Sequence, residues 1–162
     1  MRDKQFVAVH RGGLLSKDNH HQLIRWAREC SEHALSLIDK DLDERLVHAL
    51  FIAREWENNN VSTGDAMKAS VAAHAAARES SDPVFTAIAR SVGHAVATAH
   101  MADHAPGAAL YALKAIKLAG KSIEKEREWH KKQLQSCFTK EQSEIVELVL
   151  TEMMKKEKAL KI

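Results

Sequence analysis

The apolar residues of this chain recur at intervals of three and four positions, the spacing that places side chains on one face of an α-helix. Leu23, Trp26, Cys30, Ala34 and Leu37 form the first such stripe. Alternating runs of β-branched residues bounded by turn dipeptides, which would indicate strands, do not occur in the sequence. The pattern predicts an all-α protein, built as a bundle of about six to seven helices.

Capping and helix-breaking residues set the expected boundaries of these helices. Ser62, followed three positions later by Asp65, resembles a capping box and predicts a helix that runs to about Glu79. Asp82-Pro83 combines a good cap with proline at the first helical position and predicts a helix that reaches about His104. A further helix is expected between the acidic turn 39–43 and the polar run 58–60. The other expected helices cover about residues 18–38, 106–120, 122–134 and 140–158.

Alanine is concentrated in the middle of the chain, where 19 of the 25 alanines lie within residues 66–119. Because alanine has the highest helix propensity and little bulk, this segment is expected to supply a central pair of closely packed helices. No linker rich in proline, glycine or serine separates the predicted helices. We therefore expect a single helical domain over residues 1–162.

The balance of charges limits the classes of partner. The 24 lysines and arginines nearly match the 22 aspartates and glutamates, and the net charge of +2 argues against a nucleic-acid partner. No apolar run is long enough for a membrane span or a secretion signal. Cys30 and Cys137 fit neither a disulfide framework nor a zinc site, so we expect reduced thiols in a cytoplasmic protein. An alanine-rich helix left at the surface could pair with its copy, which leaves a homo-oligomer open.

Histidine is the unusual feature of the composition, with ten in the chain and four in its alanine-rich middle. His100 and His104 have the spacing at which two imidazoles on one helix can bind a divalent ion, with His74 or Asp103 as a third ligand. A second hypothesis is an anion pocket built from arginines and histidines. The preferred interpretation is that the small alanines leave room for histidines that fill the core and hydrogen-bond to the backbone or to carboxylates. The candidate polar core or ligand cluster comprises His74, Arg78, Arg90, His94, His100 and His104.

Other residues also allow two interpretations. Trp26, Trp56 and Trp129 are either core residues or anchors at an interface, and the core is preferred. The charge run 124–132 is typical of a solvated helical face. The acidic turn 39–44 is either a solvated loop or a contact surface for a partner, and the solvated loop is preferred.

The sequence offers little for catalysis. Glu29 and Glu32 beside His33 could support acid–base chemistry, but no second carboxylate is placed for it by the sequence. We expect no catalytic residues, no bound metal and no cofactor.

One longer motif covers the region after the predicted start of the fourth helix. It runs from His94 to His100, continues through Asp103–Ala109 and ends with Tyr111–Ala115. Three shorter pieces accompany it, namely Trp26-Ala27 with Cys30 and Glu32-His33, then Ala73–Arg78, then Glu126-Arg127 with Trp129. Together these motifs resemble the immunity-five-like family of bacterial immunity proteins. The resemblance covers residues 20–135 approximately and is specific, because it fixes histidines and glycines within an alanine background.

The resemblance implies an all-helical cytoplasmic protein, encoded with a polymorphic toxin, that neutralises the toxin by binding it. It brings no catalytic residues. Members often have Asp-x-Arg-Pro at the start of the second helix, whereas this chain has Asp43-Glu44-Arg45-Leu46. Two function hypotheses follow. One is a toxin-binding immunity protein, and the other is a helical metal- or anion-binding protein or enzyme that uses His74, His94, His100 and His104.

Overall fold

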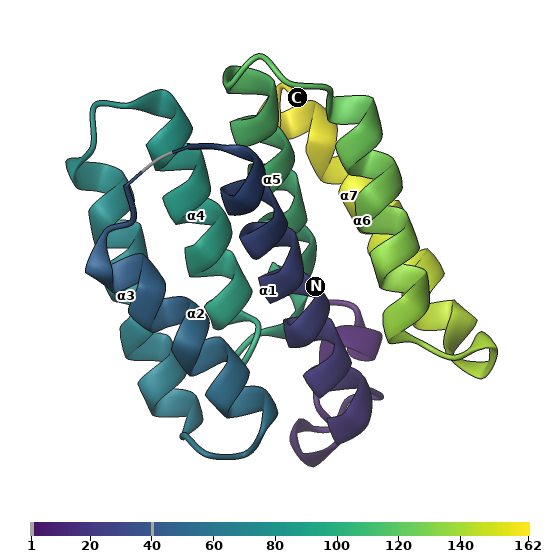
Figure 1. The fold of residues 1–162 in the computed structure, drawn as a ribbon. Coiled ribbons are helices and arrows are strands. Elements are labelled where there is room, and N and C mark those ends of the chain that lie inside the picture. The colour runs from purple at the N-terminus through teal and green to yellow at the C-terminus, as the bar shows by residue number, and fades with distance from the viewer. Residues whose placement is uncertain (1, 40) are drawn as a thin grey trace.

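The computed structural model describes residues 2–39 and 41–162, and these residues fold into helices joined by short connections (Figure 1). The α-helices in this part of the chain are α1 (Lys17–Leu37), α2 (Glu44–Glu57), α3 (Thr63–Glu79), α4 (Pro83–Ala97), α5 (Ala105–Leu118), α6 (Ile123–Cys137) and α7 (Ser143–Leu160). Four short 3-10 helices accompany them, η1 (Lys4–Phe6), η2 (Val9–Arg11), η3 (Ala102–His104) and η4 (Lys140–Gln142). The prediction of an all-α bundle is confirmed.

Local capping decides where the central helices begin. Ser62 Oγ accepts a hydrogen bond from the amide of Asp65 (3.0 Å), and the Asp65 carboxylate accepts one from the amide of Ser62 (3.2 Å). This reciprocal pair forms the predicted capping box of α3. The Asp82 carboxylate accepts from the amide of Val84 (3.0 Å), with Pro83 in the first turn of α4. Both predicted starts are confirmed.

The segment before α1 folds back on the bundle. Phe6 and Leu15 are buried, and an isolated bridge pairs Ala8 with Leu15. Ser16 follows directly, and its Oγ accepts a hydrogen bond from the amide of Asn19 (3.1 Å). This cap starts α1 slightly earlier than the predicted boundary.

The prediction that α4 reaches His104 is wrong, because this helix ends at Ala97. Thr98 Oγ1 donates a hydrogen bond to the carbonyl of His94 (3.0 Å), and Met101 adopts an extended backbone with φ −143°. The chain turns here and η3 leads into α5, which returns along α4 (Figure 1). Local helix propensity alone favours one continued helix. The chain instead forms two helices, α4 and α5, that pack closely against each other.

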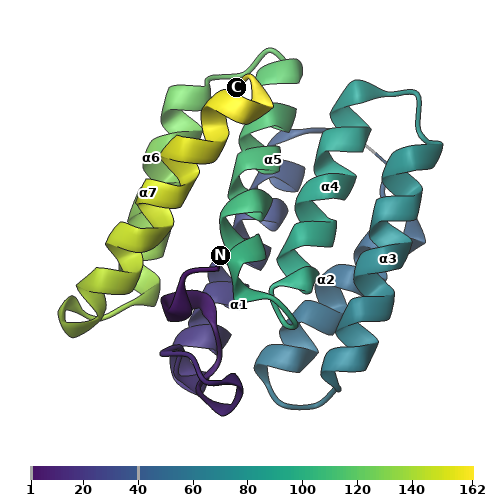
Figure 2. The same ribbon diagram turned by 180° about the vertical axis from the view of Figure 1, so that it is seen from behind.

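Helix α4 lies in the middle of the bundle, where it packs against α1, α2, α3 and α5. Figures 1 and 2 show α2 and α3 along one side and α6 and α7 along the opposite side, with α1 and α5 between them. Every alanine of α4 and α5 is buried. Small side chains thus let these helices approach each other closely in the interior.

The last helical segment starts close to its expected position. Gln142 Oε1 accepts a hydrogen bond from the amide of Thr139 (2.8 Å), which opens η4 and then α7. Ile145 and Val149 of α7 are buried in the hydrophobic cluster that also contains Trp26 and Leu134. In the described parts of the chain, each helix is too short or too polar to span a bilayer.

Candidate functional site

The structure brings the four histidines of the alanine-rich middle together. The ring of His94 on α4 lies 5.2 Å from the ring of His74 on α3 and 5.1 Å from the ring of His104, between centroids. His100 continues the row, with its ring 5.6 Å from that of His104. All four side chains are half-buried. They form a continuous row of imidazoles, called the histidine row below.

Two glycines make room for this row. An added Cβ at Gly93 would lie 2.7 Å from ring atoms of His74, and one at Gly107 would lie 3.1 Å from Nδ1 of His94. A glycine inside a helix costs about 0.5–1 kcal/mol relative to alanine. The close approach of an imidazole to the helix backbone accounts for glycine at both positions.

Arg90 fixes the protonation of His74. Its Nη1 donates a hydrogen bond to Nδ1 of His74 (2.8 Å), so that this nitrogen must be an acceptor without a proton. Burial, together with the positive charge of Arg90, lowers the pKa of His74 to about 4. Arg78 is exposed and acts on the His74 ring through its charge. Five of the six predicted cluster residues therefore meet, and Arg78 lies at the solvent side.

His94 and His104 also constrain each other. Their Nδ1 atoms are 3.0 Å apart, so one ring donates and the other accepts, and both cannot carry a proton there. Burial and the charge of His104 lower the pKa of His94 to about 3. The Tyr111 ring stacks on His94 with 5.2 Å between centroids. In this part of the row, neutral imidazoles pack against neighbouring rings and the helix backbone.

The geometry behind the metal hypothesis does not form. His100 lies in the turn after α4 and His104 ends η3, so the two are not on consecutive turns of one α-helix. The Asp103 carboxylate pairs with Arg2 (3.0 Å). Across residues 2–39 and 41–162, no three His, Cys, Asp or Glu side chains are placed to hold one metal ion.

A second buried polar cluster was not predicted. Glu126 of α6 is 2% exposed, and its Oε1 accepts a hydrogen bond from Nδ1 of His33 on α1 (2.7 Å). Nε2 of His130, one turn along α6, lies 3.1 Å from the same oxygen. Burial acts to raise the pKa of Glu126, but the interactions with His130 and His33 outweigh it and lower the pKa. The carboxylate is therefore held ionised in the interior.

The prediction of a solvated face for the charge run 124–132 is wrong at these two positions. Glu126 and His130 are buried, while neighbouring Glu128 is exposed. Their spacing of four, in line with Leu134 one turn further, was the signal that an inward-facing stripe passes through the charge run.

The three tryptophans differ in environment. Trp26 is fully buried, and its Nε1 donates to the carbonyl of His130 (3.0 Å). The ring of Trp129 stacks on His33 with 3.7 Å between centroids. Trp56 is half-buried, and its Nε1 donates to Thr63 Oγ1 (3.1 Å). Trp26 is a core residue as predicted, and the other two lie at the boundary of the core.

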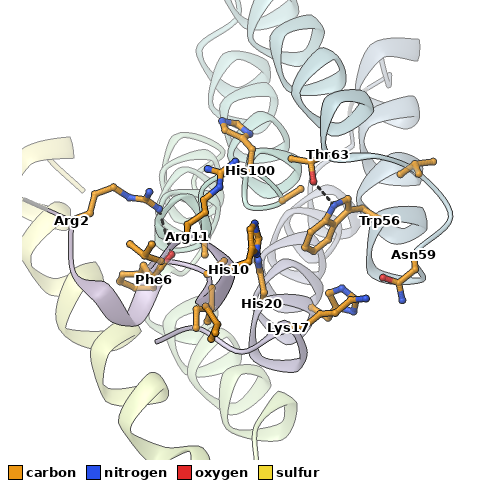
Figure 3. A pocket seen from close by; sticks show the side chains of 18 residues that line it. Arg2, Phe6, His10, Arg11, Lys17, His20, Trp56, Asn59, Thr63 and His100 are labelled. Atoms are coloured by element: carbon orange, nitrogen blue, oxygen red, sulfur yellow. Dashed lines mark hydrogen bonds between the residues drawn. The ribbon is translucent and has the colours of Figure 1, made fainter. Parts of the chain in front are cut away.

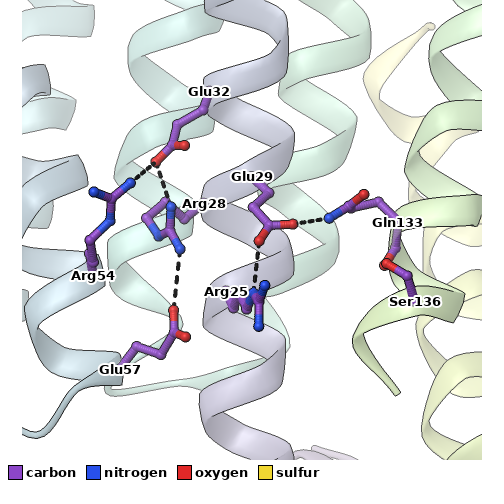
Figure 4. Close-up of polar contacts among 8 residues, drawn as sticks. All are labelled: Arg25, Arg28, Glu29, Glu32, Arg54, Glu57, Gln133 and Ser136. Atoms are coloured by element: carbon purple, nitrogen blue, oxygen red, sulfur yellow. Dashed lines mark hydrogen bonds and ion pairs between the residues drawn. The ribbon is translucent and has the colours of Figure 1, made fainter. Parts of the chain in front are cut away.

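Arginines form ion pairs with the carboxylates considered for acid–base chemistry (Figure 4). Arg28 Nη1 donates to Glu32 (2.7 Å) and its Nη2 donates to Glu57 (3.3 Å). Arg25 Nε donates to Glu29 (2.8 Å). Glu29 and Glu32 thus form ion pairs within and beside α1.

A cavity of about 640 Å³ opens at the end of the bundle where the N-terminal segment meets α1, the α2–α3 connection and the turn after α4 (Figure 3). Its lining includes the basic side chains Arg2, His10, Arg11, Lys17, His20 and His100. Apart from His100, none of these belongs to the predicted cluster. The sequence did not indicate this pocket, because its walls come from segments that are distant along the chain.

The family comparison covers most of this structure. The family model described as "Imm-5 like putative immunity protein" matches residues 13–137, from just before α1 to the end of α6. The chain belongs to this family. No curated protein and no solved structure matches the chain.

The suspected resemblance to the immunity-five-like family is therefore confirmed, and the family region contains both buried polar clusters. In this Imm-5 like protein, the expected Asp-x-Arg element has a clear structural role. Asp43 accepts a hydrogen bond from the amide of Arg45 (2.8 Å) and caps α2. The Arg45 guanidinium contacts both Asp43 oxygens and reaches Glu79 at the end of α3 (2.8 Å). Leu46, where members often have proline, is fully buried instead.

Proposed function

We propose that this protein neutralises a cognate bacterial toxin by direct binding, without a catalytic step. Membership of the Imm-5 like family is the observation that carries the proposal. A rigid helical bundle suits this task, since a preformed surface binds a partner without a large cost for ordering the chain.

The face formed by α2 and α3 is the best candidate for the contact with the toxin. Val47 and Phe51 are exposed one turn apart on α2, and Met67 and Val71 are exposed one turn apart on α3. The two helices pack against each other at the edge of the bundle (Figure 1). Exposed apolar side chains on adjacent helices favour a protein partner. We call these four residues the α2–α3 apolar strip.

The acidic turn contributes charge beside this strip. Asp39, Asp41 and Glu44 are exposed before or at the start of α2, whereas Asp43 is engaged in the helix cap. Lys40 lies outside the described residues. We infer that the exposed carboxylates steer a basic surface of the toxin toward the apolar strip.

The histidine row has an internal role in this proposal. The His74 ring packs on Gly93 and accepts a hydrogen bond from Arg90, and the His94 ring packs on Gly107 and Tyr111 and hydrogen-bonds to His104. We therefore prefer packing over the alternative of a metal- or anion-binding protein or enzyme that uses these histidines. The two free thiols, Cys30 and Cys137, support a reducing compartment such as the bacterial cytoplasm.

Co-expression with the toxins encoded beside the gene tests the proposal. The protein should restore growth against one of them. Phe51→Asp with Val71→Asp should abolish this protection, because both charges enter the apolar strip while both side chains are exposed and leave the core unchanged.

Met154→Asp is the matched control, because Met154 is 71% exposed on α7, on the other side of the bundle. It should protect as well as the unchanged protein. Growth that is no better with the protein than without it, for every toxin tested, contradicts the proposal. A dimer that dissociates only in the Phe51→Asp/Val71→Asp variant, with protection intact, would assign the strip to a second copy of this chain instead.

A further inference from the structure

The cavity at the end of the bundle is built like a ligand pocket. Its volume of about 640 Å³ lies in the usual range of about 300–1,000 Å³ for pockets that bind small molecules. Four parts of the chain form its walls, namely the N-terminal segment, the start of α1, the α2–α3 connection and the turn after α4.

The pocket carries cationic groups that have no internal counter-charge. Arg11 and Lys17 are exposed at the pocket, and neither has an ion-pair partner within residues 2–39 and 41–162. His10, His20 and His100 add imidazoles to the same lining (Figure 3). Arg2 is the exception among the cations, since it pairs with Asp103 (3.0 Å).

Nearby carboxylates do not reach the cavity wall. The described residues that line the cavity include no aspartate and no glutamate. Asp103 is engaged by Arg2, and Glu57 is engaged by Arg28. Asp18 and Glu57 act on His21 only through their charges. Among the described residues, no carboxylate inside the pocket neutralises Arg11 and Lys17.

The pKa values of two imidazoles in the pocket reflect the same positive charge. Burial and the positive charge of Arg11 lower the pKa of His100, against the opposing effect of Asp103. Burial lowers the pKa of His20 as well, and the charges of His21, His10 and Arg11 add to this effect. A bound anion would relieve this repulsion.

Most of the remaining lining residues are apolar, with His21, Asn59 and Thr63 as polar exceptions, and the indole ring among them is firmly held. Trp56 is fixed by its hydrogen bond to Thr63 (3.1 Å), and the His20 ring lies 4.7 Å from the indole ring. His20 itself is held by a hydrogen bond between Nε2 and the carbonyl of Thr98 (2.6 Å). Val9 and Val61 add aliphatic surface. An inorganic anion alone would leave most of this surface unused.

We propose that this pocket binds a small organic anion, a carboxylate or phosphate group carried on an aromatic or aliphatic body. The anionic group lies against Arg11 and Lys17, and the body lies against Trp56 and Val61. The site is separate from the α2–α3 apolar strip and requires no toxin, so it holds independently of the proposed function.

Titration with phenyl phosphate, inorganic phosphate and benzyl alcohol tests the proposal, with binding followed by calorimetry and by NMR of the histidine ring protons. In low-salt buffer at pH 7.5, phenyl phosphate should bind with a dissociation constant of about 1 mM or tighter. Inorganic phosphate and benzyl alcohol should each bind at least tenfold more weakly. The signals of His20 and His100 should move, while those of exposed His48 should not.

Charge reversal at the pocket supplies the decisive comparison. Arg11→Glu with Lys17→Glu should weaken phenyl phosphate at least tenfold and leave the thermal midpoint unchanged, because both side chains are exposed. Lys131→Glu with Lys132→Glu, two exposed cations on α6, makes the same change in net charge and should bind like the unchanged protein. Three results would overturn the proposal. Phenyl phosphate fails to bind, both double variants weaken its binding equally, or inorganic phosphate or benzyl alcohol binds as tightly as phenyl phosphate.

Discussion

The His74 ring lies against the backbone of Gly93, so that a Cβ at position 93 would come within 2.7 Å of the ring. This contact joins α3 to α4 at the start of the histidine row. Because Arg90 and His94 hold the imidazole on two other sides, the ring has little freedom to move away.

We therefore expect Gly93→Ala to lower the free energy of unfolding by about 1–2 kcal/mol, since overpacking outweighs the gain in helix propensity. Gly64→Ala is the matched control in the first turn of α3, where the nearest atom is Ser62 Oγ at 3.6 Å. It should be neutral or stabilising. Urea denaturation measures both, and the penalty of Gly93→Ala should disappear when His74 is also alanine. A penalty that persists in that double variant would show that the His74 ring is not its cause.

Glu126→Ala should be among the most destabilising single substitutions, with a loss of about 3 kcal/mol in urea denaturation. It removes the carboxylate that His33 and His130 face in the interior. Glu128→Ala, at an exposed position of the same helix, should change the free energy of unfolding by less than about 0.5 kcal/mol. Similar values for the two variants would mean that the buried cluster adds no stability.

The histidine row should make the protein less stable in acid. The pKa values of His74 and His94 in the folded protein, about 4 and about 3, lie below the ordinary value of 6.5. Below pH 6.5 the unfolded state therefore binds more protons than the folded state. The free energy of unfolding should then fall between pH 6.5 and pH 4, by about 1.4 kcal/mol per pH unit for each histidine that stays neutral in the folded protein.

Thermal midpoints between pH 8 and pH 4 measure this effect. His94→Gln should reduce the slope, whereas His48→Gln, at an exposed position on α2, should leave it unchanged. A midpoint that is constant over the whole range would show that these imidazoles titrate freely in the folded protein.

Both cysteines should be unreactive in the native state. Burial raises the pKa of Cys30 well above its ordinary value and the pKa of Cys137 to about 11. At pH 8 few thiolates are present, so a thiol reagent such as DTNB should react slowly with the folded protein and quickly with both thiols in urea. Rapid labelling of one thiol in buffer would place that cysteine in a more open environment.

Helix starts were predictable from the sequence because capping is a local property. Ser62 with Asp65, and Asp82 with Pro83, need only their own chain neighbours to define a helix start. The end of α4 was not predictable in this way. Its residues favour a longer helix locally, and the turn at Thr98 forms because α5 packs back along α4.

The functional residues show the same division. The alanine background marked His74, His94, His100 and His104 as one group, and their rings do meet. The partner of His33 is 93 residues away on α6, and the basic pocket combines segments around Arg11, Trp56 and His100. Such sites depend on tertiary packing, which the spacing of residues within one helix does not reveal.

The most direct test of toxin neutralisation is a titration of purified protein against the activity of its toxin. A binding protein without a catalytic step gives a linear loss of toxin activity that is complete at one copy per toxin, independent of incubation time. The Phe51→Asp/Val71→Asp variant should require a large excess. Complete loss of toxin activity at a small fraction of one equivalent, increasing with time, would contradict direct binding and indicate an enzyme.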